Sequence, residues 1–332
     1  MIAFQLNRFD FRDKGMRRIL KPLAAVILAV LAYIAVGGAM VAVAGPLPMR
    51  GEMIDVGGRR MHLICEGPRT AAPTVLFEAG AFGFSADWGA VQQKIVAQGM
   101  RACAYDRAGM GLSDPGPNPR DGLAIVGDLE TLLKAAHEDG PFILVGHSMG
   151  GLYIRLFAVR NPDKVAGLVF VDAATPEATD TPEYQSFVKG FTRATKLAAF
   201  GAGLGLYAPL GGTWLGDKIG LPPQASAEKR RAFASPAHNR CAAEEVSNWF
   251  NTAAEGKAAG KLNPAWPVAV VTAGARMGGL RSIQSAPARQ SRQGSYENVP
   301  TASHTSLLGL KHGDAVVRGI DHVRDAGAKS AA

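Results

Sequence analysis

The hydrophobic positions of this chain gather into short apolar runs, and longer stretches with helical spacing separate them. Seven runs predict strands, at residues 60–66, 74–78, 101–105, 142–145, 168–171, 268–272 and 296–299. Several are apolar without alternation, as strands are when both faces of a parallel sheet are covered. Helical stretches such as 127–137 and 151–160 lie between them. The pattern therefore predicts an α/β fold with a doubly wound, mostly parallel sheet.

The stretch from about 175 to 262 breaks this alternation. It has no clear strand, and helical pieces at 184–200 and 227–256 flank a glycine-rich joint at 201–212. Open α/β sheets bind ligands beyond the carboxyl ends of their strands, so we expect a helical lid over that edge. The tail after Asp325 is small and polar, and we expect it to be disordered.

Residues 22–46 carry no charge and are long enough to cross a bilayer, which takes about 20 apolar residues. A basic segment, residues 1–21, precedes them, and the positive-inside rule places that segment in the cytoplasm. We therefore expect a single-pass anchor at 22–46. The globular domain, residues 53–325, would then lie on the opposite side of the membrane.

Two other interpretations of the apolar segment stay open. A cleaved signal peptide has a shorter apolar run, of about 7–15 residues, before a small-residue cleavage site. Residues 42–44 (Ala-Val-Ala) could serve as that site, and the domain would then be secreted. A buried core helix fits poorly, because the segment is apolar on every face and ends at the Gly-Pro-Leu-Pro sequence of residues 45–48.

Composition and charge narrow the functional classes. The chain has 332 residues, 47% of them hydrophobic, and a net charge of +8. Much of the basic excess lies before residue 22, and no stripe of Lys and Arg interleaved with aromatics follows, so we expect no nucleic-acid partner. The histidines and cysteines lack metal-ligand spacing, and no phosphate or dinucleotide loop is present, so we expect no metal or cofactor.

The strongest chemical signal is a Gly-His-Ser-Met-Gly sequence at residues 146–150, directly between a predicted strand and a predicted helix. A nucleophilic serine needs such a tight turn, which exposes its hydroxyl at the edge of the sheet. The glycines let strand and helix approach each other closely. Ser148 is therefore the predicted nucleophile, and a purely structural glycine-rich turn is the alternative.

A serine hydroxyl needs a base, and seven histidines are available. His304 follows the last predicted strand, so its loop can carry it over the sheet edge. We predict that it is the base. His147 would point away from the serine, and His62 lies within a strand as a structural residue. The others are expected to be exposed on helices or loops: His137, His238, His312 and His322.

Over residues 53–323 the chain resembles the α/β-hydrolase family, in its serine esterase and lipase-like members. Residues 77–83 resemble the oxyanion loop, with Trp88 following, and residues 105–114 resemble the family's Asp-Arg-x-Gly-x-Gly-x-Ser segment. Residues 146–150 resemble its nucleophile elbow. The resemblance implies an eight-stranded sheet in the order 1-2-4-3-5-6-7-8.

The resemblance also assigns the remaining site residues. The backbone amides of Ala81 and Met149 would form the oxyanion hole, although Ala79 stands where the family usually has histidine. The family's usual acid follows the seventh strand, but residues 273–279 contain no carboxylate. Asp172, after the sixth strand, is the expected acid instead; Glu297, or no acid, are the alternatives.

Other residues are expected to be structural. Asp106 and Arg107 should hold the loop beside the site, and Asp128 should cap a helix or lie in its first turn. Free thiols are the default for the three cysteines. The implied strand order places Cys65 beside Cys103, so a disulfide between them is the alternative if the domain lies outside the cytoplasm.

These features predict hydrolysis of a small ester, and less favourably an amide, through an acyl-enzyme. The lid is rich in Phe, Leu, Ala and Gly, so we expect a fairly apolar substrate. Dehalogenase and epoxide-hydrolase chemistry is disfavoured, because those relatives have aspartate at the position of Ser148. The alternatives are an iminopeptidase-like enzyme, with Glu244 or Glu245 binding a free amine, and an inactive membrane-tethered binding protein. The sequence leaves the oligomeric state open.

Overall fold

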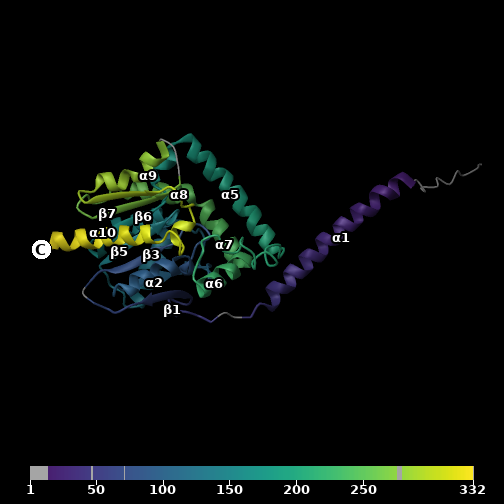
Figure 1. Cartoon of the computed structure of the whole chain (residues 1–332), viewed down its shortest axis with the longest axis horizontal. Coiled ribbons are helices and arrows are strands. Elements are labelled where there is room, and N and C mark those ends of the chain that lie inside the picture. Colours follow the sequence, from purple (N-terminus) through teal and green to yellow (C-terminus); the bar gives the residue numbers. More distant parts are fainter. Residues whose placement is uncertain (1–13, 46–47, 71, 275–278, 332) are drawn as a thin grey trace, which may run out of the picture.

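The computed structural model describes residues 14–45, 48–70, 72–274 and 279–331. A sheet in the order β1-β2-β4-β3-β5-β6-β7-β8 forms its centre (Figure 1). The strands are β1 (Glu52–Asp55), β2 (Arg60–Glu66), β3 (Thr74–Glu78), β4 (Ala102–Tyr105), β5 (Phe142–His147), β6 (Val165–Val171), β7 (Val268–Ala273) and β8 (Gly294–Val299). β2 is antiparallel to β1 and β4, and the other neighbours are parallel. The predicted fold class is confirmed; the seven apolar runs missed only β1, which is short and half polar.

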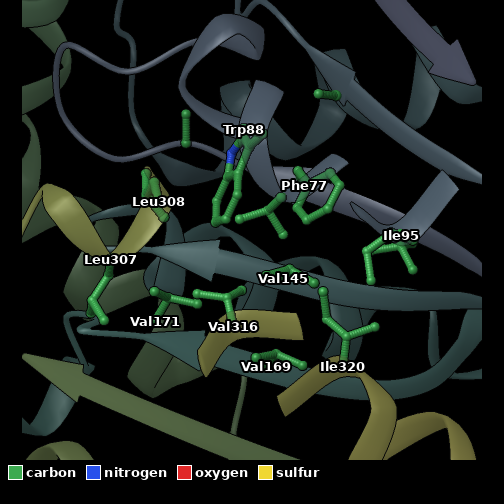
Figure 2. Packing of buried hydrophobic residues seen from close by; sticks show 14 of the residues in the cluster. Phe77, Trp88, Ile95, Val145, Val169, Val171, Leu307, Leu308, Val316 and Ile320 are labelled. Atoms are coloured by element: carbon green, nitrogen blue, oxygen red, sulfur yellow. The ribbon is translucent and has the colours of Figure 1, made fainter. Parts of the chain in front are cut away.

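Helices cover both faces of the sheet, which explains why the strands are apolar throughout. On one face, α2 (Gly89–Ala97) and α10 (Asp314–Ala331) pack over residues such as Phe77 and Val145 (Figure 2). On the other, α3 (Gly122–Ala135), α4 (Gly150–Arg160) and α9 (Gly279–Gln290) lie over the alternate residues, such as Leu76 and Leu144.

The segment between β6 and β7 is helical and is described in full. It contains a 3-10 turn, Pro176–Asp180, and the helices α5 (Pro182–Gly203), α6 (Pro223–Ala234), α7 (Pro236–Ser247) and α8 (Trp249–Ala258). The single helical piece expected at 227–256 is divided into three helices. A proline begins α7, and Ser235 caps it by accepting a hydrogen bond from the amide of His238. We call residues 175–262 the insertion.

The C-terminal tail corrects one expectation. It is not disordered: α10 continues past Asp325 to Ala331. Val316, Ile320 and Val323 repeat at helical spacing and are buried against the sheet, so the helix is already anchored before its polar end.

The position of Asp128 corrects the expectation that it caps a helix or lies in its first turn. Asp121, not Asp128, caps α3, by accepting a hydrogen bond of 3.0 Å from the amide of Ala124. Asp128 lies inside the helix, where it pairs with Arg59 and Arg120.

The N-terminal helix α1 (Lys14–Val43) extends away from the domain (Figure 1). Its part Ile19–Val43 contains an 18-residue stretch with a mean hydropathy of 2.6 and is long and apolar enough to cross a membrane. The basic N-terminus, expected at 1–21, lies outside the described residues as far as residue 13. The orientation of the chain in a membrane therefore stays a prediction.

A disulfide joins two neighbouring antiparallel strands inside the sheet, next to the edge strand β1. Cys65 on β2 and Cys103 on β4 are direct partners in the register and are covalently bonded. The default expectation of free thiols is wrong for this pair and right for Cys241, which is free and half-buried.

We expect the double variant Cys65→Ala/Cys103→Ala to lose about 4 kcal/mol of unfolding free energy, because the bond closes a loop across a sequence separation of 38 residues. Urea denaturation in mild detergent measures this loss. Cys241→Ala is the matched control, and a loss as large in the control would contradict the prediction.

Candidate active site

Ser148 stands on a sharp turn between β5 and α4. Its φ of 52° lies in the left-handed region, which is strained for a residue with a side chain. Its amide donates a 3.1 Å hydrogen bond to the carbonyl of Val171. A Cβ on Gly146 would lie 2.8 Å from the Gly150 oxygen, and one on Gly150 would lie 2.5 Å from the Glu78 oxygen. The two glycines are therefore required sterically. Ser148 itself is half-buried, so it is still partly accessible to solvent.

His304 lies beside this turn, in the loop after β8. Its Nδ1 is 2.6 Å from Oδ2 of Asp172. Nε2 of His147, a neighbour of Ser148, donates a 3.0 Å hydrogen bond to the backbone carbonyl of His304, and the two rings are 4.5 Å apart. Burial and then the charge of His304 lower the pKa of His147 to about 3. His147 is therefore neutral and positions the His304 loop.

Asp172 directly follows β6 and is also in the left-handed region, with a φ of 41°. Its amide donates a 2.7 Å hydrogen bond to Val271, which fixes the turn on β7. The carboxylate is fully buried, and Oδ1 also accepts a 3.3 Å hydrogen bond from Gln284 on α9. The alternative acid, Glu297, pairs instead with Arg318 on α10. Of the two carboxylates considered, the structure brings Asp172 to His304.

The loop after β3 packs directly against Ser148. A Cβ on Gly80 would lie 2.8 Å from the Cβ of Ser148, so only glycine permits this approach. Ala81, the first expected oxyanion donor, follows Gly80 in this loop. Met149, the second, is the N-cap of α4 and is buried. Amides in the first turn of a helix have no intrahelical acceptor, so they can donate to a negatively charged group and stabilise it.

The side chain of Arg107 binds the backbone of this loop. It is 2% exposed, and it donates hydrogen bonds of 2.8 and 2.9 Å to the carbonyls of Ala79 and Gly80. Two carboxylates accept hydrogen bonds from its guanidinium: Glu78 at the end of β3, at 2.7 Å, and Glu245 on α7, which binds two guanidinium nitrogens at 2.9 and 2.8 Å. Glu245 is therefore engaged and fully buried. That finding removes it as the amine-binding residue of an iminopeptidase.

Asp106 organises the neighbouring loop, as expected. It accepts hydrogen bonds from His62 at 2.9 Å and from the amides of Ser85 and Leu112 at 3.0 and 2.9 Å. Burial acts to raise the pKa of Asp106, but the bond to His62 and these amides keep it below the ordinary value. His62 is a structural partner of Asp106.

Two residues of the insertion escaped the sequence reasoning. Lys229 on α6 and His238 on α7 both donate to the carbonyl of Phe82, at 2.8 and 3.2 Å. Phe82 has a φ of 58°, so these bonds hold a strained residue of the loop next to Ser148. His238 was expected to be exposed but is 3% exposed. Its spacing of seven residues from Glu245 places both on one face of α7, but only the folded structure shows that this face is buried.

Comparison with known proteins identifies the family. The model of the alpha/beta hydrolase fold matches residues 73–273. The chain belongs to the alpha/beta hydrolase fold family.

Curated relatives share shorter segments with it. The "Probable transporter efuK" of Hormonema carpetanum is 36% identical over 129 residues, which cover 37% of this chain and 18% of that protein. The pyrethroid hydrolase of Sphingobium wenxiniae is 36% identical over 109 residues, or 31% of this chain and 37% of that enzyme. The matched segments thus span well under half of these relatives.

Solved structures share the whole fold at low identity. A thermophilic esterase from Thermogutta terrifontis superposes with a TM-score of 0.61 and 19% identity, over 84% of this chain and 100% of that one. A protein assigned as an epoxide hydrolase from Pseudomonas aeruginosa gives 0.66 and 17%, over 85% and 99%. At such identity the likeness supports the fold alone.

The environment of His238 predicts a loss of stability in acid. Burial, and then the charge of Lys229, lower its pKa to about 4 from the ordinary 6.5. The unfolded chain binds the proton first, so stability present above pH 6.5 is lost as the pH falls toward 4. At about pH 5 this single histidine should account for about 2 kcal/mol of lost unfolding free energy.

Urea denaturation at about pH 7.5 and about pH 5 measures this dependence. We expect the stability of His238→Gln to change less between the two conditions than that of the wild type, even though the variant loses a hydrogen bond. Exposed His137→Asn is the control and should keep the wild-type dependence. Equal pH dependence in all three proteins would contradict the assignment.

Proposed function

We propose that this protein is a serine hydrolase that cleaves carboxylic esters through an acyl-enzyme. The observation that carries the proposal is the 2.6 Å bond between His304 and buried Asp172, made beside the turn of Ser148. In this arrangement Ser148 Oγ attacks the ester carbonyl while His304 takes the serine proton. Asp172 accepts from Nδ1, fixes the ring's tautomer and stabilises the imidazolium.

The amides of Ala81 and Met149 would bind the oxygen of the tetrahedral intermediate, since both belong to backbone packed against Ser148. His304 then returns the proton to the departing alcohol, which leaves the acyl group on Ser148. In the second half of the reaction, water gives its proton to His304 and attacks the acyl carbonyl. The acid departs and Ser148 regains its proton.

The insertion, acting as a lid, would set the choice of substrate. An apolar cavity beside the Phe82 loop supports a substrate with an apolar acyl or alcohol group. The iminopeptidase alternative is weaker, because Glu245 is engaged by Arg107. Only Glu244, which is half-buried, remains as an amine-binding candidate.

We also propose that α1 anchors the enzyme in a membrane, with the catalytic domain outside the cytoplasm. The disulfide between Cys65 and Cys103 supports this side, because such bonds persist in oxidising compartments. The mass of the mature protein tests the cleaved-signal alternative: a mass that lacks residues 1–44 would contradict the anchor.

Labelling and kinetics test the catalytic assignment. A fluorophosphonate should label the wild type and fail to label Ser148→Ala. Asp172→Asn should lower kcat on a nitrophenyl ester by about 10³–10⁴-fold, because the wrong tautomer of His304 is then favoured. Glu297→Gln is the matched carboxylate control and should retain wild-type turnover.

Two results would contradict this assignment. One is resistance of Ser148 to the label in a correctly folded protein, which would favour the inactive binding protein. The other is undiminished turnover by Asp172→Asn, which would remove Asp172 from the catalytic group. Amino-acyl nitroanilides, assayed beside the esters, separate the peptidase alternative.

A further inference from the structure

The end of the insertion carries an exposed apolar surface. Residues 197–216, which we call the insertion tip, contain no charged side chain. Leu197, Phe200 and Trp214 in the tip are 71%, 68% and 70% exposed. Soluble proteins rarely expose several such large apolar side chains together, so we expect the tip to be covered by a binding partner or a membrane.

The tip contacts the C-terminal half of α1, several residues before the helix ends. Tyr33 donates a 2.9 Å hydrogen bond to the carbonyl of Leu206. Gly37 lies so close to Gly205 that a Cβ on either residue would overlap the other's backbone. In Figure 1 the end of α5 meets α1, and α5 runs crosswise to it.

This contact fixes the depth of the insertion tip relative to the apolar span of α1. The apolar span of α1 ends at Val43, six positions beyond Gly37 and ten beyond Tyr33. At about 1.5 Å per residue, the tip reaches roughly 9–15 Å below the end of the span. The hydrocarbon layer of a bilayer is about 30 Å thick. When α1 crosses the membrane, the tip must therefore enter the same leaflet.

Polar residues mark the boundary above the tip. Arg231 donates to the carbonyls of Ala44 and Gly45, directly after the apolar span. Lys218 lies 5.2 Å from the ring centre of Trp214, and basic residues with tryptophan are typical of membrane interfaces.

A cavity leads from the tip to the catalytic loop. It measures about 380 Å³ and is mainly apolar. Ala198, Tyr207, Leu210 and Leu215 line it on the side of the tip. Phe82, the strained residue held by Lys229 and His238, also lines it. The cavity thus joins the tip to the loop packed against Ser148.

We propose that the insertion tip is immersed in the leaflet that α1 crosses, and that the substrate is an apolar ester dissolved in that leaflet. The ester enters through the tip and reaches Ser148 along the cavity beside Phe82. The substrate class rests on the proposed hydrolase function, whereas the position of the tip rests only on α1 being retained as an anchor.

Fluorescence tests the position of the tip without any activity. The full chain with Cys241→Ala carries one new cysteine, Phe200→Cys, labelled with an environment-sensitive nitrobenzoxadiazole dye. The control is Ala328→Cys, exposed near the end of α10 on the side of the molecule away from α1 (Figure 1). Each is placed as a single copy in phosphatidylcholine nanodiscs, with or without doxyl groups on the lipid chains.

We expect the dye at position 200 to emit at shorter wavelength than the dye at 328 and to be quenched by the doxyl lipids. Water-like emission without quenching at position 200 would overturn the proposal. A shift that needs two copies in one disc would also overturn it, in favour of a second chain covering the tip.

Kinetics test the substrate class. In Leu197→Asp/Phe200→Asp, turnover of a long-chain nitrophenyl ester dissolved in vesicles should fall by about tenfold. Turnover of water-soluble nitrophenyl acetate should be unchanged, and Ala328→Asp should behave as wild type. Equal loss on both esters would overturn the membrane route. If the wild type cleaves neither ester, the proposed function fails with the substrate class, and the fluorescence still decides the position of the tip.

Discussion

The buried guanidinium of Arg107 is the interaction on which the site depends. Burial acts to lower its pKa, but Glu245 and Glu78 raise it well above the ordinary value. The three side chains are buried, so the guanidinium depends on the carboxylates for its charge partners and each carboxylate depends on the guanidinium. Removing one partner of such a group costs about 3–5 kcal/mol. One side chain thereby ties the end of β3, the loop beside Ser148 and the insertion helix α7 together.

Strained backbone around the site is held by hydrogen bonds from several other elements. Phe82, Ser148 and Asp172 all have positive φ, at 58°, 52° and 41°. Each such residue is costly, and each is held by bonds from a different element. Lys229 and His238 hold Phe82, and the backbones of Val171 and Val271 hold the turns of Ser148 and Asp172. The site is therefore rigid before substrate arrives, which favours preorganised catalysis.

The fold could be predicted because its signals are local. Apolar runs marked the buried strands, and the Gly-x-Ser-x-Gly sequence marked a strand-to-helix turn at Ser148. The acid that pairs with His304 could not be identified from local sequence. Asp172 precedes His304 by 132 residues, and only the folded sheet brings the two side chains together. The burial of His238 was missed for the same reason: it depends on how α7 lies over the Phe82 loop. The pairing of Cys65 with Cys103 depends on the strand order and on the redox conditions of the compartment. The spacing of the cysteines predicts neither.

The contact between Tyr33 and Leu206 joins residues 173 positions apart. Ribosomes add roughly 5–20 residues per second, so α1, which is made first, waits roughly 9–35 s for the segment that packs on it. During that time the glycine face around Gly37 is open to lipid or to another helix. In the proposed membrane arrangement, α1 therefore enters the bilayer before the insertion can close onto it, and β7 and β8 of the sheet are synthesised after both.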